Sequence, residues 1–307
     1  MTFVARLLAT FYSFFSFLFP VQTFDAIIVG AGAGGCPLAQ TLVEGGLRVL
    51  LVERGDERGP NTETLQLSVK ATGDVCVDDF VTQEGVVVAG GNCMGGATSI
   101  NHGIWIEETV DWVLDQMGSG FGTAEQIQSA FEWVRGKVAS PGTRPEGSAA
   151  NTYLDMLADS YNRSADFAGA TWNIGNDGQP TIPDDTTLFR TYSIFDSETG
   201  KRYAADTVLD RDHENLKVMV KTNVLGVLFD GDWGVPHSVS QPVGPVPRAR
   251  CVLLGNFGGR ACVQPQGRIY LTAGVFRTPE LLMKSGIGKG GSKVDNPEVR
   301  LLGALDR

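Results

Sequence analysis

The chain has 307 residues, of which 42% are hydrophobic and 20% charged, an ordinary composition for a globular protein. Its formal net charge of -10 argues against a nucleic-acid-binding surface, so no nucleic-acid partner is predicted. Glycine accounts for 39 of the 307 residues, which is well above the average usage of about 7%. The glycines gather in loops, which indicates tight turns and close approach of the backbone to a ligand.

An apolar leader occupies residues 1–23. Arg6 is its basic residue, and the apolar run from Leu7 to Phe19 ends at Pro20. This run is too short to cross a bilayer, so no stable membrane span is predicted. The pattern is typical of a secretory signal peptide and predicts a protein of the secretory pathway. The alternative is membrane association through the leader.

A βαβ unit follows the leader directly. Residues 24–29 (FDAIIV) predict a buried strand, residues 30–35 (GAGAGG) a glycine turn, and residues 36–46 a short amphipathic helix. A second strand, residues 48–52, completes the unit. A glycine-rich turn between a strand and a helix predicts a Rossmann-like α/β domain that binds a dinucleotide; the alternative is a purely structural turn.

The residue types in this unit suit a dinucleotide. Gly30 permits the tight turn, Gly32 lets backbone N–H groups approach a pyrophosphate, and Gly35 lets helix and strand pack closely. Glu53 ends the second strand, where its carboxylate can accept hydrogen bonds from the ribose hydroxyls, which disfavours NADP. The unit alone does not separate NAD from FAD.

A second glycine-rich loop spans residues 88–105, VAGGNCMGGATSINHGIW. Its paired glycines permit backbone contact with a flat ring. Thr98, Ser99 and Asn101 offer donors for phosphate or ring polar atoms. The alternative is a polar loop without a ligand.

The middle of the chain predicts one well-defined helix, residues 123–138. Thr123 and Gln126 have the spacing of a capping box. Phe131, Trp133 and Val134 are expected in the core rather than at a cofactor. The following residues, 140–185, are rich in loop formers.

Residues 215–230 predict two short strands joined around residues 221–223, which together read as a hairpin. A Pro/Gly-rich insertion follows at residues 231–250. Cys251 and Cys262 then bracket a further hairpin and could form a disulfide in an oxidising compartment.

The other cysteines are Cys36, Cys76 and Cys93. No CxxC pair occurs, so neither a metal site nor a dithiol redox centre is predicted. Cys36 and Cys93 lie in glycine-rich loops and are expected to be small packing residues. The odd number of cysteines leaves at least one thiol within the chain.

Residues 272–288, TAGVFRTPELLMKSGIG, predict a strand-to-helix turn. Gly274 allows an unusual backbone angle at the turn. Thr278 is expected to cap the helix with Pro279 as its first residue. Gly286 is expected to end it in the left-handed conformation.

Several of these segments, in this order, resemble the glucose-methanol-choline (GMC) flavin oxidoreductases. Residues 272–288 resemble the second family signature and residues 88–105 the first. Residues 199–209 look like the run leading into a helix over the substrate cavity, and residues 215–230 like the segment holding the adenine, with Val224 at the contacting position. The loop residues that match the first signature one by one are Gly95, Gly96, Ala97, Thr98, Ser99 and Asn101. One departure is GNCMGGA, which replaces the usual arginine-containing approach to the loop.

The resemblance covers residues 24 to about 290 and is nearest to the mandelonitrile-lyase and HOTHEAD-type branch. It implies an FAD-binding domain from residues 24–110 and 190–307, with residues 111–189 beginning an α+β substrate domain that is incomplete. FAD is the implied cofactor. The implied cofactor-binding residues are Gly30, Gly32, Gly35, Glu53, Cys93, Gly95, Gly96, Thr98, Asn101, His102, Gly103, Ile104 and Val224.

The resemblance also implies an activity, oxidation of the CH–OH group of an alcohol, which would be a partner only of a completed chain. Such chemistry needs a base, and the family places its histidine in a C-terminal segment that this chain is expected to lack. The chain's histidines are His102, His213 and His237, and none is assigned a catalytic role. The alternatives are a non-catalytic FAD-binding module, a cyanohydrin-lyase-like fragment and an NAD-linked enzyme.

Overall fold

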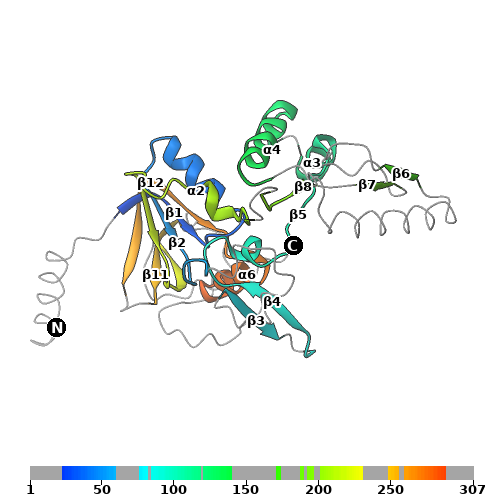
Figure 1. Cartoon of the computed structure of the whole chain (residues 1–307). Coiled ribbons are helices and arrows are strands. Elements are labelled where there is room, and N and C mark those ends of the chain that lie inside the picture. The colour runs from blue at the N-terminus through cyan, green and yellow to red at the C-terminus, as the bar shows by residue number, and fades with distance from the viewer. Residues whose placement is uncertain are drawn as a thin grey trace, which may run out of the picture. The chain divides into compact units, whose positions relative to one another are not determined.

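The computed structural model describes residues 23–59, 76–81, 84–118, 120–139, 171–173, 187–189, 192–196, 201–230, 248–255 and 259–287 (Figure 1). The described residues up to Asp56 and from Asp210 onward form one compact unit, the sheet unit. Those from Glu57 to Leu209 form a second, the loop unit. The predictions for residues 1–22 and for residues 231–247 of the insertion lie outside the described residues.

The sheet unit is built on a six-stranded sheet with the order β10-β11-β12-β1-β2-β9. Neighbours from β12 to β9 run parallel, whereas β10, β11 and β12 are antiparallel. The strands are β1 (Thr23–Val29), β2 (Val49–Val52), β9 (Leu216–Met219), β10 (Val224–Phe229), β11 (Ala249–Leu254) and β12 (Arg260–Leu271).

The predicted βαβ unit is confirmed at the centre of this sheet. β1 and β2 pair in parallel, and α2 (Gly35–Glu44) joins them. Every β2 residue is buried, as expected for a parallel strand covered on both faces. Ile27 of β1 and Leu50 of β2 share one core cluster with Leu281. The sheet unit is therefore Rossmann-like.

The predicted hairpin at residues 215–230 is wrong. Both strands form, but β9 pairs with β2 at one edge of the sheet and β10 with β11 at the opposite edge. Periodicity locates a strand but does not identify the strand with which it pairs, and a short connection between two strands does not require a hairpin. Lys221, in that connection, has a positive φ of 52°.

The hairpin predicted between Cys251 and Cys262 is confirmed. These residues face each other in the β11–β12 register and form a disulfide. The packing role expected for Cys93 is wrong, since Cys93 forms a disulfide with Cys76. Cys36 retains its thiol, is fully buried, and donates to the Ala31 carbonyl oxygen at 3.1 Å.

The helix after β12, α6 (Gly274–Lys284), begins earlier than predicted. Ala273 rather than Thr278 is its N-cap, and Pro279 lies inside the helix. Gly274 has the expected unusual backbone angle, with φ 87°. Gly286, with φ 86°, closes the helix: its N–H bonds to Met283 O, and the next N–H bonds to Leu282 O.

The loop unit consists of short elements, among them an antiparallel ribbon of β3 and β4. The strands are β3 (Val77–Val81), β4 (Val87–Gly91), β5 (Ile104–Trp105), β6 (Thr171–Asn173), β7 (Thr187–Phe189) and β8 (Tyr192–Ser193). The helices are η3 (Gly96–Ser99), α3 (Val110–Met117), α4 (Ala124–Val138) and η4 (Ala205–Val208). In the part of the chain described here, no helix is long and apolar enough to traverse a bilayer.

The predicted capping box of α4 is confirmed. The Gln126 N–H donates to the Thr123 hydroxyl at 3.3 Å, and the Gln126 side chain accepts from the Thr123 N–H at 2.9 Å. The side chains expected in the core, Phe131, Trp133 and Val134, are half-buried. Ile127 and Val138 are the buried residues of this helix.

Candidate functional site

The first glycine turn follows the end of β1 and is packed without spare room. Gly30 has φ 103°, and a Cβ there would lie 2.5 Å from the Thr272 carbonyl oxygen. A Cβ on Gly35 would overlap the Gly30 carbonyl oxygen. The Thr272 hydroxyl donates to that same carbonyl at 2.8 Å. Residue 272, to which the sequence assigned no role, thus braces the turn.

Glu53 ties the end of β2 to this turn. Its Oε2 accepts from the Ala31 N–H at 2.9 Å, and its Oε1 accepts from the Gly55 N–H at 2.8 Å. The residue is buried, and burial raises the pKa of its carboxyl, against the opposing effect of these two backbone donors. Gly30, Gly35 and Glu53 are therefore brought together.

The N-terminus of α2 directly follows the first glycine turn. Gly34 is the N-cap, no side chain caps the helix, and the first turn carries no acidic residue. Helix N-terminal N–H groups and the helix dipole favour a negative charge such as a pyrophosphate. Gly32, directly before this terminus, is half-buried, and its carbonyl accepts from the Cys36 N–H at 3.1 Å.

The connection between β9 and β10 passes beside the end of β2. Thr222 N–H donates to the Glu53 carbonyl at 2.9 Å, and Lys221 N–H donates to Gly55 O at 2.7 Å. Val224 begins β10 and is buried in the core cluster, opposite Leu254 of β11. The predicted adenine segment thus contacts the backbone at Glu53, while Val224 itself starts the strand at the sheet edge.

The second glycine loop belongs to the loop unit. The disulfide to Cys76 holds Cys93 in this loop, and positive φ angles occur at Gly95, the N-cap of η3, and at Gly96, its first residue. Ser99 is fully buried, and its hydroxyl donates to Met94 O at 2.8 Å. Thr98 Oγ1 donates to Gly95 O at 2.6 Å and accepts from the Ala205 N–H at 2.8 Å. These two hydroxyls are engaged in holding the loop.

Asn101 ends the same loop and also stabilises it. Its Oδ1 accepts from the Gly103 N–H at 3.0 Å and from Arg202 Nη1 at 2.8 Å. Gly103 has φ 75°, and a Cβ there would overlap the Phe195 ring. The sequence includes Arg202 in a family-like run but gave no signal that it would reach this loop.

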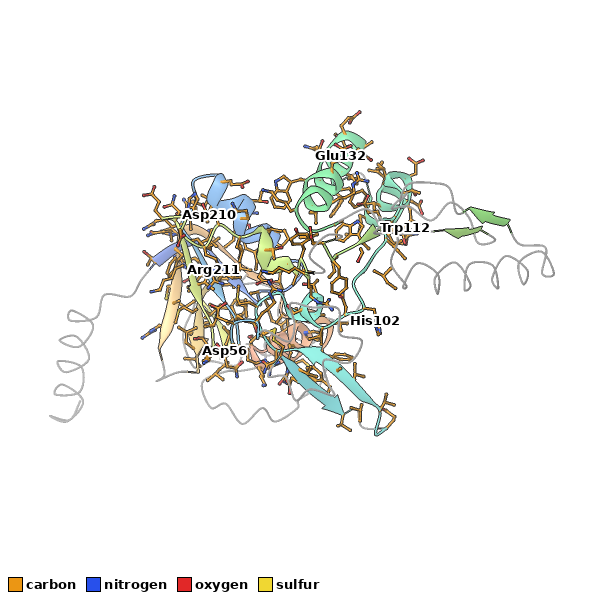
Figure 2. All side chains as sticks on the ribbon, in the orientation of Figure 1. Asp56, His102, Trp112, Glu132, Asp210 and Arg211 are labelled. Carbon is orange, nitrogen blue, oxygen red and sulfur yellow. A yellow bond between two sulfur atoms is a disulfide. The ribbon has the colours of Figure 1, made fainter. Side chains whose placement is uncertain are left out.

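The remaining predicted residues of the loop face outward. His102, labelled in Figure 2, is exposed. Ile104 is 61% exposed.

The other two histidines of the chain lie outside this loop. His213 is half-buried in a turn, where its Nδ1 accepts from the Asn215 N–H at 3.2 Å. His237 lies outside the described residues.

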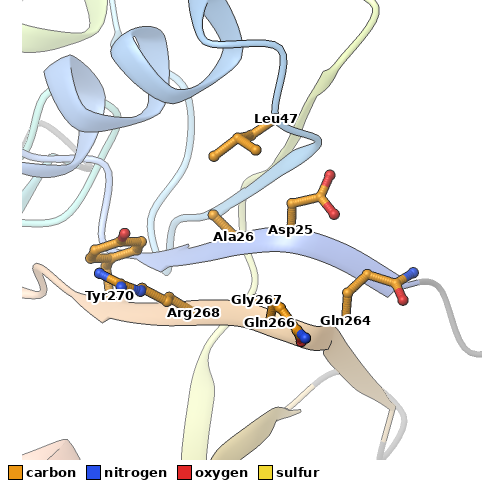
Figure 3. Close-up of a pocket in the computed structure, with 8 residues that line it drawn as sticks. All are labelled: Asp25, Ala26, Leu47, Gln264, Gln266, Gly267, Arg268 and Tyr270. Carbon is orange, nitrogen blue, oxygen red and sulfur yellow. The ribbon is translucent and has the colours of Figure 1, made fainter.

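A shallow hollow of about 310 Å³ lies elsewhere on the sheet unit, along the first half of β1 (Figure 3). Its lining carboxylate, Asp25, is already paired with Arg48 at 3.2 Å. The glycine turn follows the other end of β1, so the hollow is separate from it. The lining residues are Asp25, Ala26, Leu47, Gln264, Gln266, Gly267, Arg268 and Tyr270.

Comparison with known proteins identifies related sequences. The sequence profile of the family described as GMC oxidoreductase matches residues 24–297. The chain is 28% identical over 288 residues to (R)-mandelonitrile lyase 1 of Prunus serotina, covering 87% of this chain and 44% of that protein. It is 27% identical over 278 residues to sinalpyl alcohol oxidase Nec3 of Nesocodon mauritianus, covering 88% and 46%. The chain thus spans less than half the length of these relatives.

A solved structure shares the fold. The crystal structure of pyridoxine 4-oxidase from Mesorbium loti superimposes with a TM-score of 0.62 at 21% identity. The similarity covers 92% of this chain and 55% of that chain.

Proposed function

The chain belongs to the GMC oxidoreductase family, and on that premise we propose that it binds FAD through its two glycine loops. In the sheet unit, Gly30, Gly32, Gly35 and Glu53 would hold the pyrophosphate and ribose, with the residues before Val224 beside the adenine. In the loop unit, the loop from Cys93 to Ile104 would receive the flavin ring. The full set of candidate residues is that predicted from the sequence.

The observation that carries this proposal is the geometry around Glu53. Its carboxylate is fixed by Ala31 and Gly55, beside an α2 N-terminus that no side chain caps. A carboxylate at the end of the second strand suits the ribose hydroxyls, and the positive end of the α2 dipole suits the pyrophosphate. The arrangement of these two groups supports the proposal of an adenine-dinucleotide site.

The activity we propose for the whole protein is oxidation of the CH–OH group of an alcohol. Bound FAD would accept the hydride. The chain's own residues would bind and orient the cofactor and exclude a 2′-phosphate, since Glu53 would repel it. The similarity to Nec3, whose name identifies it as an alcohol oxidase, supports this activity.

A second candidate is cleavage of a cyanohydrin. The similarity to (R)-mandelonitrile lyase 1 favours it. The FAD site would be the same, so the two candidates differ in substrate rather than in cofactor. Incubation of the FAD-loaded protein with aromatic alcohols, and separately with mandelonitrile, distinguishes them. Aldehyde formation with flavin reduction indicates the oxidase, and aldehyde formation without it indicates the lyase.

Ligand selectivity tests the binding proposal itself. The protein, freed of flavin, is titrated with FAD, FMN, NAD and NADP while tryptophan fluorescence is recorded. We expect saturable binding of FAD and weaker binding of FMN, which lacks the AMP half that Glu53 and α2 would hold. Tighter binding of NAD than of FAD would replace the proposal with the NAD-linked alternative.

A further inference from the structure

The guanidinium of Arg202 is buried directly beneath the second glycine loop. The residue is 2% exposed. Its Nη1 donates to the Thr98 carbonyl at 3.0 Å and to Asn101 Oδ1 at 2.8 Å, and its Nη2 donates to the Asn101 carbonyl at 2.8 Å. One planar group therefore holds the two ends of the turn from Thr98 to Asn101.

The guanidinium of Arg202 also stacks on an aromatic ring. The Phe195 ring centroid lies 4.5 Å from Arg202 Cζ, and the same ring closes against Gly103, where a Cβ would overlap it. Stacking on an aromatic face is a geometry that Arg forms and Lys does not reproduce. The Phe195 ring thus contacts both the guanidinium of Arg202 and the backbone at Gly103, where the loop ends.

No carboxylate neutralises Arg202 within the described residues, where its hydrogen bonds end on carbonyl and amide oxygens. The nearby Asp206 is paired with Arg58 at 2.9 Å. Burial, and then the charge of Arg58, lower the pKa of Arg202 to about 10, so it is still protonated at neutral pH. A buried cation kept without an ionic partner is costly, which indicates a role beyond filling space.

We propose that Arg202 is the positioning residue of the second glycine loop, holding residues 98–103 in the shape that receives FAD. This inference rests on the proposed function. The three donated hydrogen bonds turn the carbonyls of Thr98 and Asn101 inward, and they engage the Asn101 side-chain oxygen. Without the guanidinium fork the Thr98 and Asn101 carbonyls would lose these donors and Asn101 Oδ1 would keep only the Gly103 N–H, so the loop would relax.

The test compares two replacements of Arg202 with a matched control in the full chain. Arg202→Met removes both charge and fork, and Arg202→Lys keeps the charge alone. Arg135 is also part-buried in the loop unit and pairs with Glu107 at 3.4 Å, so Arg135→Met loses an ion pair outside residues 98–103. Each variant is measured for FAD dissociation constant and for melting temperature without FAD.

We expect Arg202→Met to weaken FAD binding by about tenfold or more, the loss of at least one charge-assisted hydrogen bond. Arg202→Lys should also weaken it, by a smaller factor. Arg135→Met should lower the melting temperature yet leave FAD affinity within about twofold. Addition of millimolar guanidinium, but not ammonium, should restore FAD binding to Arg202→Ala, a response that a merely structural role would not give.

Folded Arg202 variants that bind FAD as tightly as the wild type would overturn the inference while leaving the proposed function intact. A wild-type chain that binds no FAD would overturn both. If the Arg202 variants do not fold, Phe195→Leu provides the milder test, because it removes only the ring face beneath the guanidinium. A several-fold loss of FAD affinity supports the inference, and an unchanged affinity contradicts it.

Discussion

Two neighbouring glycines of the first turn, Gly34 and Gly35, differ in the space available for a side chain. A Cβ on Gly34 would find Thr272 Cγ2 at 3.7 Å, an ordinary contact, whereas one on Gly35 would overlap the Gly30 carbonyl. We expect Gly35→Ala to destabilise the fold by about 1–3 kcal/mol or more and to abolish FAD binding. Gly34→Ala, the matched control, should cost less than about 1 kcal/mol. Urea denaturation measures both, and equal losses would contradict the packing described here.

Glu53 gives stability a defined pH dependence. Its folded pKa is raised, because burial penalises the charge, above the unfolded value of about 4.3. As pH rises past the unfolded value, the unfolded chain releases its proton first, so the free energy of unfolding falls until the folded carboxyl has also titrated. The contribution of Glu53 titration to the free energy of unfolding is therefore greatest at acidic pH and is lost as the pH rises to neutrality.

Glu53→Gln removes this pH-dependent contribution to stability, because glutamine does not titrate. The amide oxygen can accept from only one or the other of the Ala31 and Gly55 N–H groups, which should cost about 1–3 kcal/mol. We expect the variant to be less stable than the wild type, with a gap that narrows as pH rises from about 4 to 7. Chemical denaturation across that range checks it. A gap that stays constant or widens would contradict a raised pKa at Glu53.

The positions of residues relative to one another were predictable where the motif is local. Gly30, Gly35 and Glu53 lie within one βαβ unit, so their spacing carries the geometry. Thr272 and Arg202 reach their loops from far along the chain, 242 positions from Gly30 and 101 from Asn101, and no local pattern marks such contacts. The disulfide of Cys76 with Cys93 was missed because nothing in the sequence fixes which cysteines pair.

At the level of elements, two prolines sit in different parts of their helices. Pro279 lies inside α6 and is exposed, where it removes a backbone hydrogen bond without contributing packing. Pro37 lies in the first turn of α2, where proline is tolerated because its ring does not clash with a preceding helical turn. We expect Pro279→Ala to raise the free energy of unfolding by about 1–3 kcal/mol.

Pro37→Ala is the control and should give no gain, since it only frees the unfolded chain. Thermal denaturation of the two variants under identical conditions compares them. A gain at Pro37 equal to that at Pro279 would show that the position of proline within the helix is not the cause.

The disulfide between Cys251 and Cys262 closes the β11–β12 hairpin over a separation of 11 residues. Replacing both cysteines by alanine should lower the free energy of unfolding by about 2–3 kcal/mol, measured by urea denaturation under oxidising conditions. A reductant should bring the wild type down toward the variant. Equal stability of the variant and the oxidised wild type would show that this bridge contributes nothing.

Element prediction succeeded where sequence neighbours are also partners in space. The helix at residues 124–138 and the hairpin of β11 and β12 are local, and both were predicted. The strands β9 and β10 are neighbours in sequence but lie at opposite edges of the sheet. Strand pairing across a sheet is decided by the whole core, which explains why the hairpin expected at residues 215–230 did not form.

For the whole molecule, cofactor binding and catalytic turnover make separate demands. Binding needs a pocket for an adenine dinucleotide, and the sheet unit supplies the turn, the helix N-terminus and Glu53 that suit it. Turnover of an alcohol also needs a group that takes the hydroxyl proton. The chain spans 44% and 46% of two relatives, and FAD binding is the function proposed for the part that is present.

FAD binding can be tested by the visible absorption spectrum of the chain, purified after expression and reconstituted with FAD. Once unbound flavin has been removed by gel filtration, we predict a flavin band that co-elutes with the protein, and acid release of FAD at close to one equivalent per chain. Gly34→Ala should keep that band. A properly folded wild-type chain that elutes colourless, with no FAD released, would contradict the account.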